Sequence, residues 1–302
     1  MTDHPSVGVV LPTRARPQQA LAAARAILAQ DYPGELRLAV VCDGQAPEFD
    51  LETDDRVGLL ANRRTPGLAG ARNTGALALT TDLIAFCDDD DVWLPGKLRA
   101  QVNAMRARTD AHMASCGILV RYDGRSSPRL IGRDMVSYDD LVRSRMVMVH
   151  SSTYLLRREA LLDGIGLFDE RIPHAQNEDW DLALRAARQS PIAFVDQPLV
   201  QVTWGDGSYF ARNWQTRVEG LLWILERHPD LTASNVGAAR IYAQLAFAYA
   251  CLGERDQARL WTGRALRRNW HERRIPFVLA VMAGIVSGDS LLHVLHRHGH
   301  GI

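Results

Sequence analysis

The sequence predicts an α/β protein with a doubly wound sheet, followed by an all-helical C-terminal extension. Three observations lead to this prediction. Short apolar runs alternate with amphipathic stretches over the first third of the chain, which is typical of a parallel sheet covered by helices. Four consecutive aspartates, residues 88–91, directly follow the apolar run 83–87. From about residue 211 onward the strand patterns stop and helical periodicity continues.

The first strands are expected where apolar runs are continuous, because a strand buried on both faces shows no alternation. Helices are expected between these runs: Pro17 opens the first, a turn at 65–67 leads into the second, and Pro95 suits the first turn of a third. The four strands are expected at residues 7–11, 36–42, 56–60 and 83–87.

The middle of the chain is less regular. Ser137 is a plausible cap for a short helix over 137–145, and Asn177 precedes a helix with an acidic first turn. A loop is expected at 164–171. Further strands are expected at residues 111–122, 152–156, 192–195 and 199–204.

The sequence pattern of the last third predicts only helices, at residues 213–227, 235–252, 254–269 and 274–286. Residues 243–266 look like one helix–turn–helix unit of the tetratricopeptide type, but one copy is not an array. We therefore expect two parts, an α/β domain over residues 1–210 and a helical bundle over residues 211–302.

The composition narrows the class of protein. The chain has 302 residues with 35 basic and 35 acidic side chains, so no excess charge points to nucleic acid. Its four cysteines show no Cys-x-x-Cys spacing, which favours a reducing, cytoplasmic setting. The longest apolar run near the end, 275–286, is too short to cross a bilayer.

The acidic run is the strongest chemical signal. Four carboxylates at the end of a buried strand repel one another and are costly to remove from water. A divalent cation with oxygen ligands relieves both penalties, and the carboxyl ends of strands are where ligands sit in open α/β sheets. The run therefore predicts a metal site that serves a phosphate. The alternative is a solvated acidic turn, but a turn needs only one or two aspartates.

Six motifs occur in order along residues 6–205, and together they resemble the family 2 glycosyltransferases of the GT-A fold. They are Val-Val-Leu-Pro-Thr (9–13), Asp-Gly (43–44), Gly-x-x-x-Ala-Arg-Asn-x-Gly (67–75), Asp-Asp-Asp-Asp-Val-Trp-Leu-Pro (88–95), Gly-Leu-Phe-Asp-Glu (166–170) and Asn-Glu-Asp-Trp (177–180). The resemblance implies a Rossmann-like mixed sheet flanked by helices. It also implies an inverting hexosyltransferase with a DXD motif, a nucleotide-sugar donor and Mn²⁺ or Mg²⁺.

The resemblance assigns the donor-binding residues. It implies that Pro12, Thr13, Asp43 and Arg72 form the nucleoside pocket, Asp43 through the base. The family's Asp-x-Asp-Asp pattern falls on Asp88, Asp90 and Asp91. Asp88 and Asp89 would face the ribose and donor sugar, and Asp90, with Asp88, would hold the metal. With four aspartates in a row, a register shifted by one residue stays open. The family often places His or Arg in the loop at 204–208, which closes over the pyrophosphate; here neither is present, and Arg212 or Arg14 is the candidate to replace it.

The resemblance also assigns the acceptor side. Asp179 would be the catalytic base, and Glu178 and Asp181 would shape the acceptor side. His150 and Trp180 are weaker acceptor candidates. Each residue has a plainer interpretation: acidic residues at a helix start are common, Arg72 could form a structural ion pair, and His150 and Trp180 could belong to the core.

The sequence departs from the family in the first loop, where the usual Tyr-Asn-Arg is replaced by residues 14–16, Arg-Ala-Arg. The aromatic ring that would stack on the base is absent. A UDP-sugar is the expected donor, with dTDP- and GDP-sugars open. The acceptor is expected to carry a hydroxyl and to be a glycan, a lipid-linked sugar, a natural product or a peptide.

The helical extension lies outside the resemblance, and two roles are open for it. Residues 255–274 interleave arginines with leucine and tryptophan, so they could contact the inner membrane face, although a solvated helix face has the same pattern. The apolar segment 275–286 could pair two chains.

Two rival functions stay open. A sugar-phosphate nucleotidyltransferase shares this fold, but it would need glycine in the Pro-Thr-Arg-Ala-Arg-Pro loop at 12–17, which has none. A non-catalytic scaffold that uses the helical extension would have no reason to retain both acidic motifs.

Overall fold

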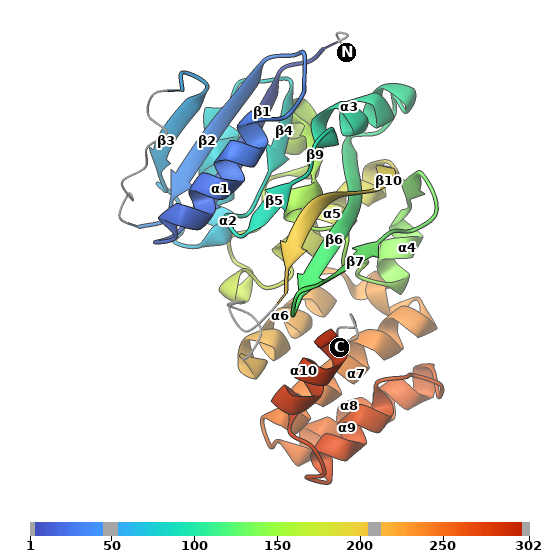
Figure 1. The fold of residues 1–302 in the computed structure, drawn as a ribbon. Coiled ribbons are helices and arrows are strands. Elements are labelled where there is room, and N and C mark those ends of the chain that lie inside the picture. Colours follow the sequence, from blue (N-terminus) through green and yellow to red (C-terminus); the bar gives the residue numbers. More distant parts are fainter. Residues whose placement is uncertain (1–3, 45–53, 205–212, 298–302) are drawn as a thin grey trace.

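The computed structural model describes residues 4–44, 54–204 and 213–297. In these residues the strands form one sheet in the order β3-β2-β1-β4-β9-β6-β10-β5, with β7 beside β6 and β8 beside β10 (Figure 1). The strands β1 to β4 are parallel, whereas β9 is antiparallel to β4 and β6. Their bounds are β1 Val7–Thr13, β2 Leu36–Cys42, β3 Val57–Ala61, β4 Leu83–Phe86, β5 Asp91–Trp93, β6 Met113–Tyr122, β7 Arg125–Arg129, β8 Met135–Val136, β9 Leu155–Arg157 and β10 Ile192–Thr203.

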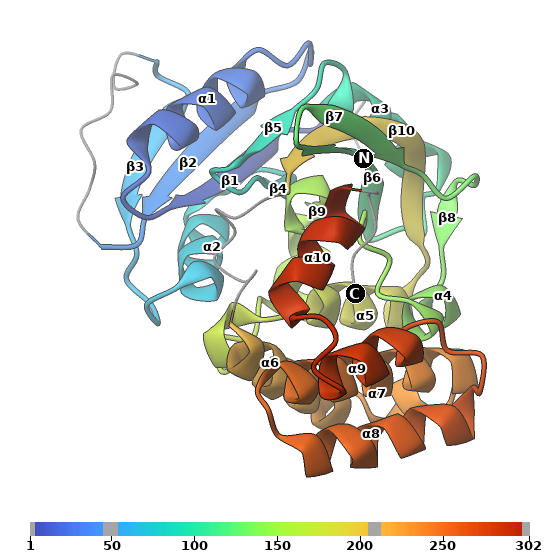
Figure 2. The ribbon, with the colours of Figure 1, turned by 60° about the horizontal axis from the view of Figure 1, so that its bottom comes forward.

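Helices cover both faces of this sheet (Figure 2). Along β1, Val9 and Leu11 pack on the side of α1 and α3, whereas Val10 packs on the side of α2 and α5. A strand buried on both sides reads as a continuous apolar run, and the predicted doubly wound sheet is confirmed. The helices of this part are α1 Pro17–Leu28, α2 Leu68–Ala78, α3 Lys97–Ala107, α4 Tyr138–Arg143 and α5 Glu178–Gln189, with short helices η1 Ser151–Thr153, η2 Ala160–Ile165 and η3 Pro173–Ala175.

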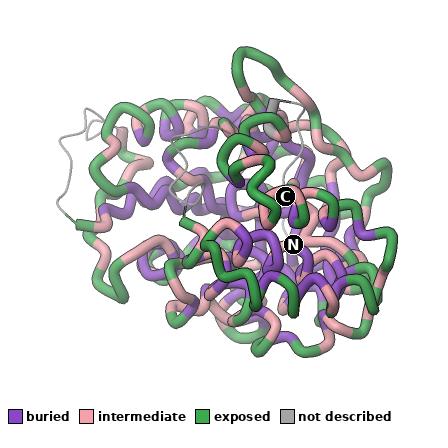
Figure 3. The backbone as a smooth tube through the Cα atoms, turned by 90° about the horizontal axis from the view of Figure 1, so that it is seen from below, coloured by how far each residue is buried: buried purple, intermediate pink, exposed green. Residues whose placement is uncertain are grey.

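The C-terminal extension is helical, as predicted, and shares its core with the sheet. Leu182 of α5 and Leu245 of α7 belong to one cluster of buried apolar residues. Figure 3 shows which stretches of the backbone are buried and which are exposed. The division at residue 210 therefore stays a prediction. No helix within the described ranges is long and apolar enough to span a membrane. The elements are α6 Trp214–Arg227, η4 Pro229–Thr232, α7 Asn235–Cys251, α8 Arg255–Arg268, α9 Ile275–Met282 and α10 Gly288–Arg297.

The structure corrects the predicted helix at 274–286. The helix α9 stops at Met282, because Gly284 takes a φ of +73° and the amides of Gly284 and Ile285 bond back to Val281 and Ala280. This is the Schellman ending that a glycine favours. A further helix, α10, follows, and its His293 Nδ1 lies 2.9 Å from the Tyr122 hydroxyl at the end of β6.

Three predictions in the middle of the chain were also wrong. Residues 152–156 are not one strand, because η1 takes Ser151–Thr153 and only Leu155–Arg157 extends. The two strands expected at 192–195 and 199–204 are one, β10, whose register shifts on either side of Pro198. Proline lacks the amide that the ladder needs, but here the strand continues past it. The short strands β5 and β7 were not predicted, and η2 takes the first part of the expected loop 164–171.

Candidate active site

The candidate site lies where the parallel strands end. Thr13 ends β1, Asp43 follows β2, and Asp88 follows β4. Since β1 lies between β2 and β4, these three ends meet at one edge of the sheet. The Asp43 amide donates to the Thr13 carbonyl at 2.9 Å, and Pro12 is buried in β1 opposite Val41. Ligands of open α/β sheets bind at such an edge.

Asp43 joins the end of β2 to the start of α2. Its carboxylate accepts hydrogen bonds from Asn62 Nδ2 at 2.8 Å and from the Gly67 amide at 3.0 Å. Gly67 takes a φ of +118°, a conformation that favours glycine. The exposed Arg14 guanidinium lies 3.9 Å from the same carboxylate. Further along α2, a Cβ on Gly75 would lie 2.4 Å from Val10 Cγ1, so this helix packs closely on β1.

The acidic run is not a simple solvated turn. Asp89 and Asp91 are buried, whereas the side chain of Asp90 is 45% exposed. Thr13 Oγ1 donates to Asp89 at 2.8 Å. Arg16 Nη1 lies 3.3 Å from Asp89 and 3.2 Å from Asp90. Arg16 was not among the predicted site residues, although it stands in the loop that departs from the family pattern.

Burial and neighbouring negative charge act together on these carboxyls. Burial raises the pKa of Asp89, although Thr13 and Arg16 oppose it. Desolvation also raises the pKa of Asp90, and the charges of Asp88 and Asp89 add to the effect. Burial, followed by Asp88 and Asp90, raises the pKa of Asp91 well above its usual range. A further positive charge at the end of β4 would therefore lower the pKa of these carboxyls and stabilise their ionised forms.

Arg72 of α2 is the centre of the site. Its guanidinium donates to Glu178 Oε1 at 2.6 Å, to Asp88 Oδ1 at 2.6 Å and to Ser151 Oγ at 2.8 Å. Ser151 Oγ in turn donates to the other oxygen of Asp88 at 3.0 Å. The Arg72 side chain is 1% exposed. Burial lowers its pKa, but the two carboxylates outweigh this and raise it overall. Arg72 therefore forms ion pairs with Asp88 and Glu178, as its plainer interpretation held. A contact between Arg72 and the nucleoside stays a prediction.

Asp179 and Glu178 stand at the start of α5 and are both buried. Arg145 Nη2 donates to both oxygens of Asp179, at 2.9 and 2.8 Å. Burial raises the pKa of Asp179, but Arg145 outweighs it and holds the pKa below its usual value. Burial raises the pKa of Glu178 to about 7, although Arg72 opposes the shift. Two adjacent carboxyls thus hold protons differently at neutral pH.

His150 lies beside the same cluster, with its Nδ1 4.0 Å from Asp91 Oδ2. Burial lowers its pKa to about 4, against the opposing charges of Asp179 and Asp88. Its imidazole is therefore neutral at neutral pH. Its Nε2 is buried and makes no hydrogen bond to any residue that the structure describes.

The structure places two predicted acceptor residues away from the cluster. Trp180 is buried in the core, as its plainer interpretation held. Asp181 is fully buried and bonds Arg185 Nη2 at 2.7 Å and His228 Nε2 at 2.8 Å. Because successive helical residues are 100° apart, Asp181 points nearly opposite to Asp179. The assignment of Trp180 and Asp181 to the acceptor side stays a prediction.

The structure also explains why two of the motifs occur together. Asn73 of α2 donates to the Phe168 carbonyl at 2.9 Å and accepts from the Phe168 amide at 3.0 Å. Asn73 Nδ2 also donates to Glu170 at 2.7 Å. Burial raises the pKa of Glu170, but its bonds to Asn73, Arg64 and Thr65 lower it to about 2. The motif at 166–170 therefore braces α2, and with it Arg72.

Three residues of the site were missed by sequence reasoning: Arg16, Arg145 and Ser151. Arginines are common in this chain, and no spacing singles out Arg145 at the end of the predicted helix 137–145. Ser151 lay just before a segment that we predicted to be a strand. Contacts over long sequence separations define all three.

The chain is similar in sequence to known glycosyltransferases. The profile of the family described as Glycosyl transferase family 2 matches residues 8–164. A pre-mycofactocin glycosyltransferase of Mycobacterium tuberculosis is 30% identical in an alignment of 223 positions that covers 67% of this chain and 45% of that protein. The Escherichia coli UDP-Glc:alpha-D-GlcNAc-diphosphoundecaprenol beta-1,3-glucosyltransferase WfgD is 34% identical over 105 residues, 33% of this chain and 40% of that protein. The chain therefore spans less than half the length of these relatives.

Solved structures share the fold. TarS 1–349 of S. aureus, in complex with UDP-GlcNAc, superposes with a TM-score of 0.63 at 15% identity, covering 98% of this chain and 92% of that one. The mannosyltransferase PcManGT of Pyrobaculum calidifontis, in complex with GDP-Man and Mn²⁺, gives 0.55 at 19% identity, covering 98% and 89%. At these identities the likeness shows the GT-A fold alone. With the profile match over half of its length, the chain belongs to glycosyl transferase family 2.

Proposed function

We propose that this chain transfers a sugar from a nucleotide-sugar to a hydroxyl acceptor, with inversion and with the help of a divalent cation. The observation that supports this best is the bridge that Arg72 makes between Asp88 and Glu178. It joins the donor side, at the end of β4, to the acceptor side, at the start of α5. A transferase needs both sides in one site, because the acceptor must attack the donor sugar in line.

The donor is proposed to be a UDP-sugar, with dTDP- and GDP-sugars as alternatives. Support comes from the UDP-GlcNAc and UDP bound to TarS and from the UDP-Glc in the name of WfgD, whereas PcManGT was solved with GDP-Man. The nucleoside is proposed to bind at the ends of β1 and β2, next to Thr13, Asp43 and Arg14.

The cation is proposed to be Mn²⁺ or Mg²⁺, held by Asp90 and Asp88. Their hard carboxylate oxygens suit these ions, and a nearby cation would oppose the burial that raises the pKa of Asp90. Among the described residues no three His, Cys, Asp or Glu side chains are grouped to hold a metal. Such a cation would therefore take most of its ligands from the diphosphate and water, as Mg²⁺ commonly does. A bound cation would stabilise negative charge on the departing diphosphate.

Asp179 is proposed to accept the proton of the attacking hydroxyl. Its lowered pKa keeps it ionised at neutral pH, and the two bonds from Arg145 fix its plane. Glu178, with a pKa of about 7, is the neighbour that could replace it as base, since a base works best near the operating pH. The glycan, lipid-linked, natural-product and peptide acceptors all stay open, as do pairing of two chains and contact with a membrane.

One experiment tests donor, metal and base together. Melting temperatures are recorded with UDP-, dTDP- and GDP-sugars, with and without Mn²⁺, because a ligand of the folded state raises the melting temperature. We expect one nucleotide to stabilise the wild type only with metal, and Asp90→Ala to lose that dependence. Asp179→Asn should keep the dependence but release nucleoside diphosphate from the donor about 10²–10⁴-fold more slowly.

The controls separate the assignments. Asp110→Asn makes the same chemical change at an exposed residue between α3 and β6, outside the Arg72 network, and it should behave as wild type in both assays. If Asp179→Asn turns over normally while Glu178→Gln does not, Glu178 is the base. Stabilisation by a nucleoside triphosphate together with a sugar phosphate, and not by any nucleotide-sugar, would favour a nucleotidyltransferase instead.

A further inference from the structure

The far end of the helical extension has an exposed surface that sugar transfer does not use. At the turn between α8 and α9, residues 267–274 read Arg-Arg-Asn-Trp-His-Glu-Arg-Arg. Trp270 in this turn is 76% exposed, and its ring lies against that of His271, with centroids 3.5 Å apart and planes tilted by 39°. An indole is a large apolar group that folding normally covers. Its exposure among arginines needs an explanation.

The helix α8 continues this surface. Its inner face, with Ala258, Trp261 and Ala265, packs on α7. Its outer face carries two half-exposed leucines, Leu260 and Leu266. The other outward positions of α8 are mostly arginine: Arg255, Arg259, Arg264, Arg267 and Arg268.

The charge on this surface is largely uncompensated. Residues 254–274 contain seven arginines and three acidic residues. Of the acidic residues, Glu272 is buried against Arg274 and Asp256 pairs with Arg259. Neither Arg267 nor Arg273 has a carboxylate partner among the residues that the structure describes. The surface therefore offers free positive charge next to Trp270.

We propose that this basic aromatic surface, formed by Leu266, Arg267, Arg268, Trp270 and Arg273, docks on an anionic phospholipid membrane. Positive charge complements the anionic headgroups, and tryptophan prefers the membrane interface. The surface has three arginines and no acidic side chain, so it matches the uniform negative charge of such a membrane.

The position of the surface is compatible with an open active site. The helices α8 and α9 lie on the side of α7 that faces away from the sheet, and α8 contacts α7 and α9 (Figure 1). Docking there leaves the strand ends free. The proposal does not depend on the sugar-transfer activity, since it uses none of the residues of that site.

The test is co-sedimentation of the full chain with phosphatidylcholine vesicles, with and without phosphatidylglycerol. We expect binding only when phosphatidylglycerol is present, and loss of binding at high salt. Arg267→Gln and Arg273→Gln should each lower the partition coefficient about fivefold. Trp270→Ala should lower it as well, and quenching of tryptophan fluorescence by brominated lipid should be lost with it.

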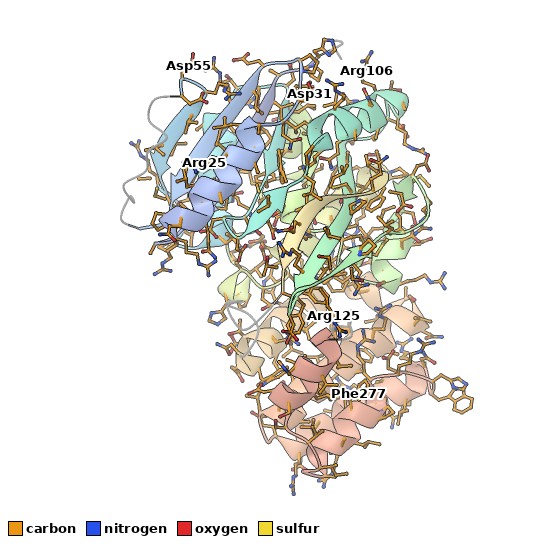
Figure 4. All side chains as sticks on the ribbon, in the orientation of Figure 1. Arg25, Asp31, Asp55, Arg106, Arg125 and Phe277 are labelled. Atoms are coloured by element: carbon orange, nitrogen blue, oxygen red, sulfur yellow. The ribbon has the colours of Figure 1, made fainter. Side chains whose placement is uncertain are left out.

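The control variant removes one arginine and one apolar side chain elsewhere. Arg25 on α1 is exposed (Figure 4), and Leu77 on α2 is 45% exposed, so Arg25→Gln with Leu77→Ala should bind vesicles like the wild type. Equal binding to both kinds of vesicle, no binding, or equal loss in the control would overturn the proposal. Asp90→Ala should still bind vesicles, so failure of the metal site is distinguishable from failure of the membrane surface.

Discussion

In the sheet half, the charged network around Arg72 is buried, whereas in the helical extension the arginines of α8 are exposed. In the sheet half, Arg72, Glu178 and Asp179 are buried in one network. Lys97 is also buried, 2.7 Å from Gln101 Oε1 and 3.7 Å above the Trp93 ring, and burial lowers its pKa to about 8. In the extension, α8 turns its arginines outward, and buried alanines fill the core side of α7 and α8.

The difference shows in which part of the fold the cost of burying charged groups arises. A buried charge is costly unless hydrogen bonds and an opposite charge compensate it. Compensation in the sheet half is dense but incomplete, since the pKa of Glu178 and that of Asp91 remain raised. Surface arginines need no such compensation. Mutations that remove charge should therefore have large effects in the buried network around Arg72 and small effects on the exposed face of α8.

The largest effect is expected for Arg72→Met. The variant leaves Asp88 and Glu178 close together without their shared cation, and breaking a buried ion pair costs about 3–5 kcal/mol. Urea unfolding at neutral pH measures the change in the free energy of unfolding. Release of nucleoside diphosphate from the donor should fall to background in the same variant.

The matched control for this prediction is Arg255→Met, which makes the same chemical change on the exposed face of α8. A loss of stability in Arg255→Met as large as that in Arg72→Met would remove the contrast between the two regions. A wild-type stability in Arg72→Met would show that the network is held together by other contacts.

A smaller, pH-dependent effect is expected for His150→Gln. The pKa of His150 is lowered to about 4 in the folded protein, against about 6.5 when unfolded. Between these values the unfolded chain binds a proton that the folded protein does not. Wild-type stability is therefore lost as pH falls from about 6.5 to about 4, by roughly 3 kcal/mol at most.

The measurement is the free energy of unfolding of wild type and His150→Gln across that pH window. The difference between the two should move in favour of the variant as pH falls. Glu178 titrates with the opposite sign, because its raised pKa favours the folded state at low pH, but it is common to both proteins and cancels. A difference that stays constant with pH would contradict a buried, neutral His150.

The smallest effect is expected for Arg259→Gln. Arg259 pairs with Asp256 at 3.0 Å, but both side chains are well exposed. Exposed ion pairs contribute about 0–1 kcal/mol, so the free energy of unfolding should change by less than about 0.5 kcal/mol. Thermal unfolding at low and high salt provides the check. A large change would mean that the extension depends on surface charge after all.

Much of the fold followed from local sequence, and the exceptions have specific causes. The continuous apolar runs predicted β1, β2 and β4, and Ser137 did cap α4 through a capping box with Asp140. The strands β5 and β7 were not predicted because each is short and exists through pairing with β10 or β6. Local propensity carries little information about such strands.

The candidate site was predictable in part. The acidic run and the start of α5 stood out because like charges gather there in sequence. The partners Arg145, Ser151 and Arg16 did not, since each meets its carboxylate through the fold. The family resemblance assigned Asp181 to the acceptor side, and that role stays a prediction; the structure buries this carboxylate against Arg185 and His228.

The sequence by itself determined the layered α/β fold, the helical extension and the carboxylates at the strand ends, because apolar periodicity and charge repulsion act between near neighbours in the chain. Only the tertiary structure decided which arginine side chain pairs with each carboxylate. Arg72 reaches Glu178 across more than a hundred residues, and Arg145 rather than solvent lowers the pKa of Asp179. Electrostatic interactions depend on distance in space and on burial, and neither can be read from the order of residues.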